Sequence, residues 1–484
     1  MTHTLPPSRR AALKYAASAL TIGPTLLTQG CAHRTHRHRV AIIGAGLSGL
    51  NAAMELEEKG IDYVVLEASN RVGGRVYTRD DLDHRPEAGG TSVGQSYQRF
   101  WQRCEQFGIE LVPQGQLKSG WSLNIGGEMI RPDEWEGSSL NKTVGRERAI
   151  SPMALEGWYR RQLGGFADVE SWQTTEAHPF DVPLSDLYTN KGASAEALRL
   201  MEVNASVPNF DEASGVGAMR RTTLLQSLSE RWRMRAYTVK GGSSRLPEAM
   251  AASLNQPVRF GEQVVAIDQT SAPVKLVTST GTTYQCDDVI CTIPFTAAQS
   301  IRFTPDLPAP MAAAIMDAKF VKTSLVHIQP KRRFWEDDGF APSMWTDGAI
   351  GRLFKRWDDP AVKDHDALTL WVTGDACTPF DQMDAPDRHR FVKEQLAQLR
   401  PASEGQIDII GENLWGKSPL AGGAYHLFGP GQIKQFAGEL RKPVGKLHFA
   451  GEQTALVMVG MEAALESGER AAKAVASVGG ASSL

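Results

Sequence analysis

One stretch near the N-terminus of the chain reads Val40-Ala41-Ile42-Ile43-Gly44-Ala45-Gly46-Leu47-Ser48-Gly49. Its first four residues are apolar and mostly β-branched, which predicts a buried parallel strand, and a GxGxxG motif follows at once. Residues 50–59 have the apolar spacing of a helix, and a second apolar strand, residues 63–66, is followed by Glu67. This is a complete βαβ unit. The sequence therefore predicts an α/β fold with a Rossmann-like dinucleotide-binding domain.

The residue types of this unit suit a dinucleotide. Gly44, Gly46 and Gly49 let the backbone and the start of the helix approach a pyrophosphate. Glu67 can accept hydrogen bonds from ribose hydroxyls, and its charge disfavours the 2′-phosphate of NADP. FAD and NAD are the two candidates at this point.

A second motif separates these two cofactors. Residues 67–78 read Glu67-Ala68-Ser69-Asn70-Arg71-Val72-Gly73-Gly74-Arg75-Val76-Tyr77-Thr78. The two glycines permit close approach to a diphosphate, and Arg71 and Arg75 place positive charge beside it. This stretch resembles the second FAD signature of the flavin amine oxidase family. The resemblance implies FAD as the cofactor and an FAD-binding domain of the two-dinucleotide-binding type.

The resemblance extends over nearly all of the chain after residue 38. Residues 87–92 are similar to the loop that passes over the flavin ring, and residues 447–452 to a strand that runs into a flavin contact. Residues 460–472 are similar to a helix whose N-terminus faces the flavin and stabilises its reduced, charged form. The FAD-binding residues implied by the resemblance are Gly44, Gly46, Ser48, Gly49, Glu67, Arg71, Gly74, Arg75, Gly90, Thr91, Val264, Trp415, Gly451, Glu452 and Met461.

The length of 484 residues predicts two large domains, or one domain with a substantial insertion. The resemblance assigns residues 39–95, 240–306 and 440–478 to a discontinuous FAD-binding domain. Residues 96–239 and 307–439 are then expected to form an α+β substrate-binding domain, as in amine oxidases. The proline-rich stretch 304–310 is expected to link the two domains.

The predicted active site lies where the substrate domain meets the flavin. Trp415 resembles a residue beside the isoalloxazine, and Tyr425 resembles one of two aromatic walls that sandwich the amine. Such a cage excludes water and favours the neutral amine. The resemblance implies hydride transfer from the amine to FAD, which leaves an imine that water hydrolyses.

Two departures from the family pattern concern the cofactor and the cage. Ala424 stands where some relatives carry a flavin-linking cysteine, so FAD is expected to be held non-covalently. Gly460 stands where the second aromatic wall would be, which favours a bulkier or ring-containing amine.

Two further departures concern the oxidant and the substrate. Counting back from Phe334-Trp335 places Leu325 where many relatives hold a lysine near the flavin, and Lys322, a candidate for this role, is three residues out of register. Without this lysine, reaction with O2 is expected to be slow, which favours another acceptor. The arginine with which amino-acid oxidases bind a carboxylate would align near Ser92, which disfavours an α-amino acid substrate, although another arginine could substitute.

We therefore expect an FAD-dependent oxidoreductase that converts a primary or secondary amine to an imine, and then to an aldehyde or ketone. The electrons pass to O2, giving H2O2, or to another acceptor such as a cytochrome. Three alternatives stay open, since related folds share the FAD motifs. They are an L-amino-acid oxidase, a flavin-dependent carbon–carbon desaturase, and a non-catalytic flavin-binding redox partner.

The composition limits the kinds of partner that the protein is expected to bind. A net charge of −3 gives no basic field, so nucleic acid is disfavoured, and the expected partner is a small-molecule amine. Five cysteines without a CxxC pair fit neither a disulfide scaffold nor a zinc site, and no metal is expected. A homodimer is a further expectation for the assembly of the chain.

Residues 1–38 are interpreted as an export signal and linker. Ser8-Arg9-Arg10-Ala11-Ala12-Leu13-Lys14 before an apolar stretch, residues 15–27, resembles a bacterial twin-arginine signal, although Ala12 stands where phenylalanine is usual. The apolar stretch is too short for a stable membrane span. We expect a periplasmic protein; lipid anchoring at Cys31 is the less favoured alternative to a plain thiol. The basic stretch 33–39 is expected to be a solvated linker.

Overall fold

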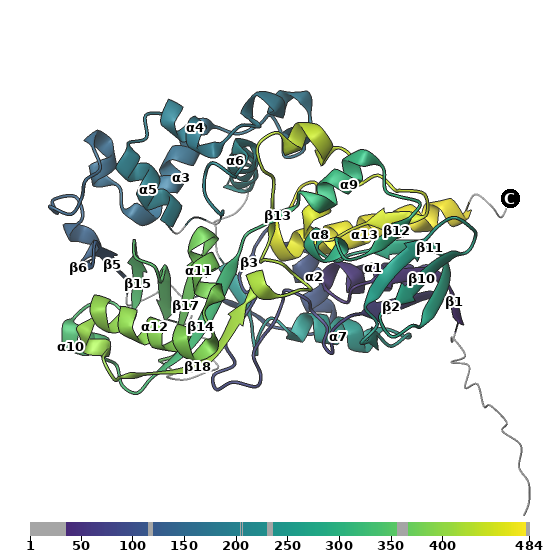
Figure 1. The fold of residues 1–484 in the computed structure, drawn as a ribbon, viewed down its shortest axis with the longest axis horizontal. Helices are drawn as coiled ribbons and strands as arrows, with labels where there is room; N and C mark the ends of the chain where they lie inside the picture. Colours follow the sequence, from purple (N-terminus) through teal and green to yellow (C-terminus); the bar gives the residue numbers. More distant parts are fainter. Residues whose placement is uncertain are drawn as a thin grey trace, which may run out of the picture.

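The computed structural model describes residues 35–114, 120–203, 205, 207–229, 236–355 and 366–480. The twin-arginine motif, the apolar stretch and Cys31 lie outside the described residues. Figure 1 shows two lobes, and each contains one of the two large sheets.

The first sheet contains the predicted βαβ unit. Strand β1 (Thr35–Ile43) pairs in parallel with β2 (Tyr63–Glu67) on one side and β11 (Thr283–Cys291) on the other. The strand order is β12-β9-β10-β11-β1-β2-β8, and β20 also pairs with β11. The remaining strands are β8 (Arg259–Phe260), β9 (Val264–Asp268), β10 (Val274–Thr278), β12 (Arg302–Thr304) and β20 (Leu447–Phe449).

Strand β1 begins earlier than the predicted domain boundary at residue 39. Thr35 pairs with Thr283 and His38 with Cys286, so residues 35–38 are part of the sheet. The described part of the stretch 33–39 is therefore a strand and not a linker, although residues 35–37 are exposed to solvent as expected. Hydrogen bonding to β11, which lies far away in the sequence, extends the strand beyond its apolar residues.

Helices bury both faces of this sheet, as expected for parallel strands. On one face, Val40, Ile42 and Val65 pack beneath α1 (Leu47–Glu58) and α13 (Gly460–Gly480). On the other face, Ala41 and Val64 pack in a core with α8 (Phe295–Ala298) and α9 (Ala309–Met316). Alternate residues of β1 thus face two different cores.

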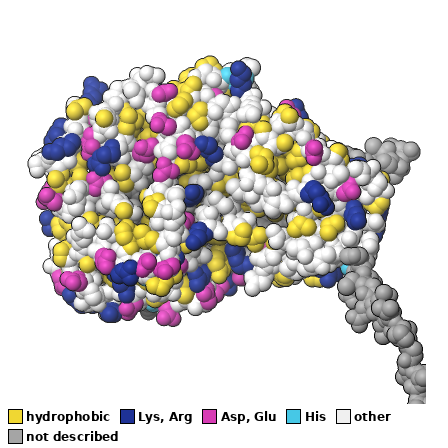
Figure 2. All heavy atoms as spheres, in the orientation of Figure 1, with side chains coloured by type: hydrophobic (Ala, Val, Ile, Leu, Met, Phe, Trp, Pro, Cys, Tyr) yellow, Lys and Arg dark blue, Asp and Glu magenta, His cyan; other side chains and the backbone are white. Residues whose placement is uncertain are grey.

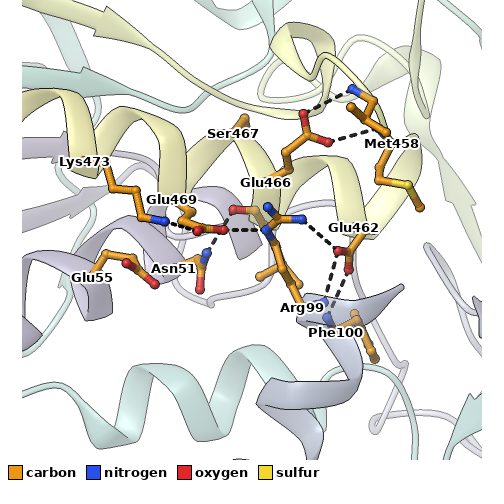
Figure 3. Close-up of polar contacts among 12 residues, drawn as sticks. Asn51, Glu55, Arg99, Phe100, Met458, Glu462, Glu466, Ser467, Glu469 and Lys473 are labelled. Carbon is orange, nitrogen blue, oxygen red and sulfur yellow. Dashed lines mark hydrogen bonds and ion pairs between the residues drawn. The ribbon is translucent and has the colours of Figure 1, made fainter. Parts of the chain in front are cut away.

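Helix α13 also holds α2 (Gln98–Gln106) in place. Its buried Glu462 accepts hydrogen bonds from the backbone amides of Arg99 and Phe100, both at 3.0 Å (Figure 3). Arg99 Nε also donates to Glu469, which pairs with Lys473. A carboxylate at the N-terminal amides of α2 satisfies donors that have no partner within that helix.

The second sheet belongs to the substrate domain, with the order β18-β14-β17-β16-β15-β5-β6. Its strands are β5 (Trp121–Ile125), β6 (Glu128–Ile130), β14 (Thr323–Pro330), β15 (Ser343–Thr346), β16 (Arg352–Lys355), β17 (Leu368–Thr373) and β18 (Ile407–Leu414). Its helices are α10 (Trp335–Asp338), α11 (Cys377–Gln382) and α12 (Ala385–Leu399), with a separate group of α3 (Pro152–Leu163), α4 (Leu184–Asn190), α5 (Ala195–Val203) and α6 (Gly215–Ser229) (Figure 1).

Short elements join the two domains. A three-stranded sheet, β3-β7-β4, combines β3 (Val93–Gly94) with β4 (Leu111–Pro113) and β7 (Ala236–Val239). The remaining α-helix is α7 (Arg245–Ser253), and the remaining strands are β13 (Lys319–Phe320) and β19 (His426–Leu427). The face seen in Figure 2 carries interspersed acidic and basic side chains. Over the described ranges, no helix combines the length and apolar character that a membrane crossing requires.

Candidate functional site

A cavity of about 420 Å³ lies between the two sheets. It begins at the glycine-rich turn after β1 and reaches the strands of the substrate domain. Of the fifteen predicted FAD-binding residues, all but Gly49 line it, as do Tyr425 and Gly460. A Cβ atom at Gly49 would come within 1.9 Å of the Gly44 carbonyl oxygen, so Gly49 allows the close approach of helix and turn instead.

The glycine-rich turn has the geometry that a pyrophosphate needs. Gly44 adopts a positive φ of 101°, and Gly46 caps α1 without a side-chain hydrogen bond to the first amides of the helix. Apart from its two chain neighbours, no described residue has an atom within 4 Å of a Cβ built on Gly46, which lines the cavity. Free helix N-terminal amides beside open space form an anion site, so these residues fit the diphosphate of FAD.

Glu67 is held in position by this turn. Its Oε2 accepts a hydrogen bond from the Ala45 amide at 2.7 Å, and its Oε1 accepts from the Ser69 amide and hydroxyl at 2.9 and 2.7 Å. The carboxylate therefore lies fixed at the end of β2, on the cavity wall, where a ribose hydroxyl can reach a remaining acceptor position.

The two arginines of the second motif contact different parts of the molecule. Arg71 donates to the backbone carbonyls of Val72 and Gly74 and lies over the Tyr77 ring, 4.0 Å from its centroid, which stiffens its own loop. Arg75 crosses to the substrate domain: it donates to the Ala424 carbonyl at 2.8 Å and lies 3.6 Å from Glu452. Burial raises the pKa of Glu452, and Arg75 opposes that rise.

The far end of the cavity is largely aromatic and apolar. Trp415 donates its indole N–H to the Ala88 carbonyl at 2.5 Å, which links it to the loop predicted to pass over the flavin. Trp371, Leu325, Leu420 and Tyr425 complete this wall. Sequence analysis did not identify Trp371 as a site residue, because its position here depends on its pairing with Leu325 across β14 and β17.

Gly460 lies on the cavity wall with a φ of +65°, which favours glycine. A Cβ at this position would lie 3.1 Å from the hydroxyl of Tyr97. The positive φ and the nearby Tyr97 hydroxyl both explain why this position is a glycine.

Lys322 is not brought to the cavity. Its Nζ donates to Thr378 Oγ1 at 3.0 Å, whereas Thr323 and Leu325 line the cavity. Side chains alternate along a strand, so residues an odd number apart face opposite sides. The expectation that Lys322 acts near the flavin is corrected by this geometry, and among the described residues no lysine lines the cavity.

His426 follows Tyr425 but faces away from the cavity. Its ring packs against those of Phe295, Phe320 and Phe428, with centroid distances of 4.6 to 6.4 Å. Burial, together with the charges of Arg75 and Arg220, lowers the pKa of His426 to about 3. This histidine is therefore neutral at physiological pH.

Fold and site together define a two-domain oxidoreductase that binds a dinucleotide between a Rossmann-like domain and a substrate domain. Comparisons with known proteins specify it further. The family model described as flavin containing amine oxidoreductase matches residues 47–476. The chain belongs to this family, and it is an FAD-dependent oxidoreductase that acts on amines.

Relatives and solved structures cover most of the chain. The flavin-containing amine oxidase of Danio rerio is 26% identical over 455 residues, spanning 90% of this chain and 85% of the relative. Amine oxidase B of Homo sapiens is 27% identical over 463 residues, with the same coverage. The structure of putrescine oxidase bound to putrescine covers 92% of this chain and 100% of that one, with a TM-score of 0.73 and 20% identity. Cyclohexylamine oxidase from Brevibacterium oxydans covers 91% and 99%, with a TM-score of 0.74 and 23% identity.

These comparisons confirm the predicted fold class and the FAD cofactor. The four cysteines of the described residues are buried and do not line the cavity, so none of them stands where a covalent link to FAD could form. The assignment of individual residues to FAD contacts stays a prediction that the cavity supports.

Proposed function

We propose that the protein oxidises a primary or secondary amine, bound as the neutral amine against the aromatic wall. The observation that carries this proposal is the asymmetry of the cavity. One end offers free amides and Glu67 for a dinucleotide, and the other offers Trp371, Trp415 and Tyr425 for an uncharged organic group.

The protein orients the bound amine and keeps water away from it. Bound FAD supplies the two-electron acceptor, and the substrate loses a hydride and a proton to become an imine. The apolar wall of Leu325, Leu420 and Trp371 favours the neutral amine, because an ammonium ion would lose its hydration there. Gly460 adds no side chain to this space, which leaves room for a bulky or cyclic amine.

An anaerobic stopped-flow experiment tests this proposal. Holoenzyme is mixed with a panel of linear, aryl and cyclic amines, and loss of the oxidised flavin absorbance is followed. We expect bleaching by amines and none by saturated acyl compounds that lack nitrogen, the substrates of a desaturase. FAD-bound protein that no amine bleaches would contradict the proposal and favour the redox-partner alternative.

The electron acceptor is proposed from the cavity wall. Leu325 lies where the resemblance predicts a lysine, and no lysine lines the cavity within the part of the chain that the structure describes. We infer slow reoxidation by O2 and a second acceptor, such as a cytochrome. Mixing reduced enzyme with O2 and, separately, with cytochrome c gives the two rates, and faster reoxidation by O2 would overturn this inference.

We further propose export to the bacterial periplasm, on the strength of the Arg9-Arg10 motif. Cell fractionation should find the wild-type chain in the periplasm and an Arg9→Lys, Arg10→Lys variant in the cytoplasm. A Cys31→Ser variant should behave as the wild type, because lipid anchoring is not expected. An unchanged location of the double variant would refute the proposal. The homodimer considered from the sequence stays a prediction for sedimentation analysis.

A further inference from the structure

Two side chains at the substrate end of the cavity carry polar groups without a hydrogen bond. They are Thr323 of β14 and Trp371 of β17, and both line the cavity. The hydroxyl of Thr323, a residue only 1% exposed, and the indole N–H of Trp371 are buried and have no partner among the described residues. Of all such unpartnered side-chain atoms in that part of the chain, these two alone belong to residues of the cavity wall. Because buried polar groups in proteins are normally paired, they indicate contact with a ligand.

The sheet places the two groups side by side. In the register of β14 and β17, Thr323 pairs with Thr373 and Leu325 pairs with Trp371. Thr323 and Leu325 are two residues apart and therefore project from the same face, and so does Trp371. Thr323 and Trp371 are thus diagonal neighbours across two strands, a spacing that an aromatic side chain can span. One small group in the cavity can contact both.

The strand on the other side of Trp371 supports its ring. Phe354 of β16 lies 5.5 Å from Trp371 between ring centroids, and the guanidinium of Arg352 lies 5.4 Å from the Trp371 centroid. Neither Phe354 nor Arg352 lines the cavity. They pack against the indole and hold its orientation, while the ligand meets the indole itself.

The substrate is the ligand that these positions favour. None of the residues predicted to bind FAD lies on β14 or β17. The described residues that the substrate domain contributes to the cavity wall are all uncharged, so a charged group would find no counter-ion among them. The group that meets Thr323 and Trp371 is therefore a neutral part of the substrate.

The donor and acceptor types of the two side chains narrow this group further. An indole N–H only donates, so the ligand atom must accept a hydrogen bond, whereas a threonine hydroxyl both donates and accepts. A hydroxyl of the ligand can accept from Trp371 and donate to Thr323. Such a group satisfies both side chains at once.

We propose that Thr323 and Trp371 bind a hydroxyl group of the substrate, so that the preferred amines are amino alcohols or phenolic amines. This inference rests on the proposed function and names its substrate class. The hydroxyl takes no part in bond breaking and stays in the product. An amine without it leaves both side chains unpaired, and a site built to pair a substrate hydroxyl discriminates strongly against an analogue that lacks it.

The test compares amines that differ only by a hydroxyl. The pairs are tyramine with 2-phenylethylamine, 6-aminohexan-1-ol with hexylamine, and 3-aminocyclopentanol with cyclopentylamine, which place the hydroxyl on aryl, linear and cyclic frames. Holoenzyme is assayed by anaerobic flavin bleaching. In at least one pair we expect kcat/KM of the wild type to be about tenfold or more higher for the hydroxylated member.

Variants assign this preference to the two side chains. Thr323→Val and Trp371→Phe each remove one polar group at nearly constant shape, and each should lower the ratio of the two kcat/KM values by about 3- to 10-fold. Thr323→Ser keeps the hydroxyl and should keep the preference. Thr373→Val is the matched control, because the Thr373 hydroxyl is also buried and unpartnered in the described chain but Thr373 does not line the cavity. It should leave the ratio unchanged.

A cofactor titration separates substrate from flavin as the partner. Apoprotein of the wild type and of Thr323→Val is titrated with FAD, and we expect equal Kd values, because the hydroxyl is reserved for the substrate. Weaker FAD binding by Thr323→Val, with no change in the ratio of kcat/KM values, would show that the group contacts the cofactor and would overturn the inference.

The remaining outcomes distinguish this inference from the proposed function. If in every pair the plain amine bleaches the flavin at least as fast as its hydroxylated partner, the hydroxyl subsite is refuted and amine oxidation stands. No bleaching by any compound would contradict both. If Trp371→Phe does not fold, the wild-type panel and the Thr323 variants still decide the question.

Discussion

Single residues set the affinity for the cofactor, and Glu67 is the clearest case. Its three hydrogen bonds to Ala45 and Ser69 hold the turn that faces the diphosphate. We expect Glu67→Gln to weaken FAD binding by about 10- to 100-fold, because charge-assisted hydrogen bonds contribute roughly 1.5–3 kcal/mol. Fluorescence titration of the apoprotein measures this. Glu262→Gln is the control, because Glu262 lies on the same wall but is hydrogen-bonded to threonine. An equal loss of FAD affinity in this variant would contradict the specific role of Glu67.

We expect the free energy of unfolding to depend on pH through His426. Its pKa falls from about 6.5 in the unfolded chain to about 3 in the folded one, so the folded state favours the neutral ring. Stability from this group is fully present above pH 6.5 and is lost as the pH falls toward 3. Between pH 7 and pH 5 the wild type should lose ~2 kcal/mol that His426→Phe does not lose. Denaturant unfolding at both pH values measures this, and His178→Gln should keep the wild-type slope. Equal slopes in wild type and His426→Phe would contradict the prediction.

At the scale of elements, α6 and α13 hold the segment that leads to Gly460 and Met461. Arg220 of α6 donates to the carbonyls of Ala455, Leu456 and Met458 at 3.1–3.2 Å. Glu466 of α13 accepts from the amides of Leu456, Val457 and Met458 at 2.9–3.2 Å, in part visible in Figure 3. The segment before the predicted flavin contact is thus fixed from both domains, through its carbonyls and its amides.

Arg220→Lys should therefore loosen this segment. All three donations come from Nη2, and a lysine cannot make them together with the planar stacking on Trp172, where the guanidinium lies 4.3 Å from the ring centroid. We expect a loss of about 2–4 kcal/mol in unfolding free energy and weaker FAD binding. Denaturant unfolding and flavin titration measure both. Arg390→Lys, in an exposed ion pair of α12, should change neither, and a variant Arg220→Lys with wild-type FAD affinity would show that the segment is held by other contacts.

At the scale of the whole molecule, the cavity couples the two domains. Its lining comes from both sheets, and Arg75 reaches across to Ala424. FAD bound there stabilises only the assembled form, by about 2.7 kcal/mol at a free concentration of 100 times Kd. We expect FAD to raise the Tm of the apoprotein in a single transition. FMN, which lacks the adenosine that is predicted to reach Val264 and Glu67, should raise it less. Equal shifts by FMN and FAD would contradict the predicted position of the adenosine half.

The sequence by itself determined the local, contiguous features of this protein. The βαβ unit of residues 40–67, the second motif at 67–78 and the terminal helix from Gly460 were predictable, because turn glycines, strand runs and helical spacing act between near neighbours in the chain. Most of the residues around the cofactor end of the cavity follow from these motifs.

Tertiary structure alone decided the substrate end. Whether Lys322 or Leu325 faces the cavity depends on the parity of β14, and Thr323 and Trp371 are neighbours only through pairing of strands far apart in sequence. The start of β1 at Thr35 likewise depends on β11. Such contacts are non-local, and a shift of one residue in register turns every side chain to the other face, so no pattern within a single strand could reveal them.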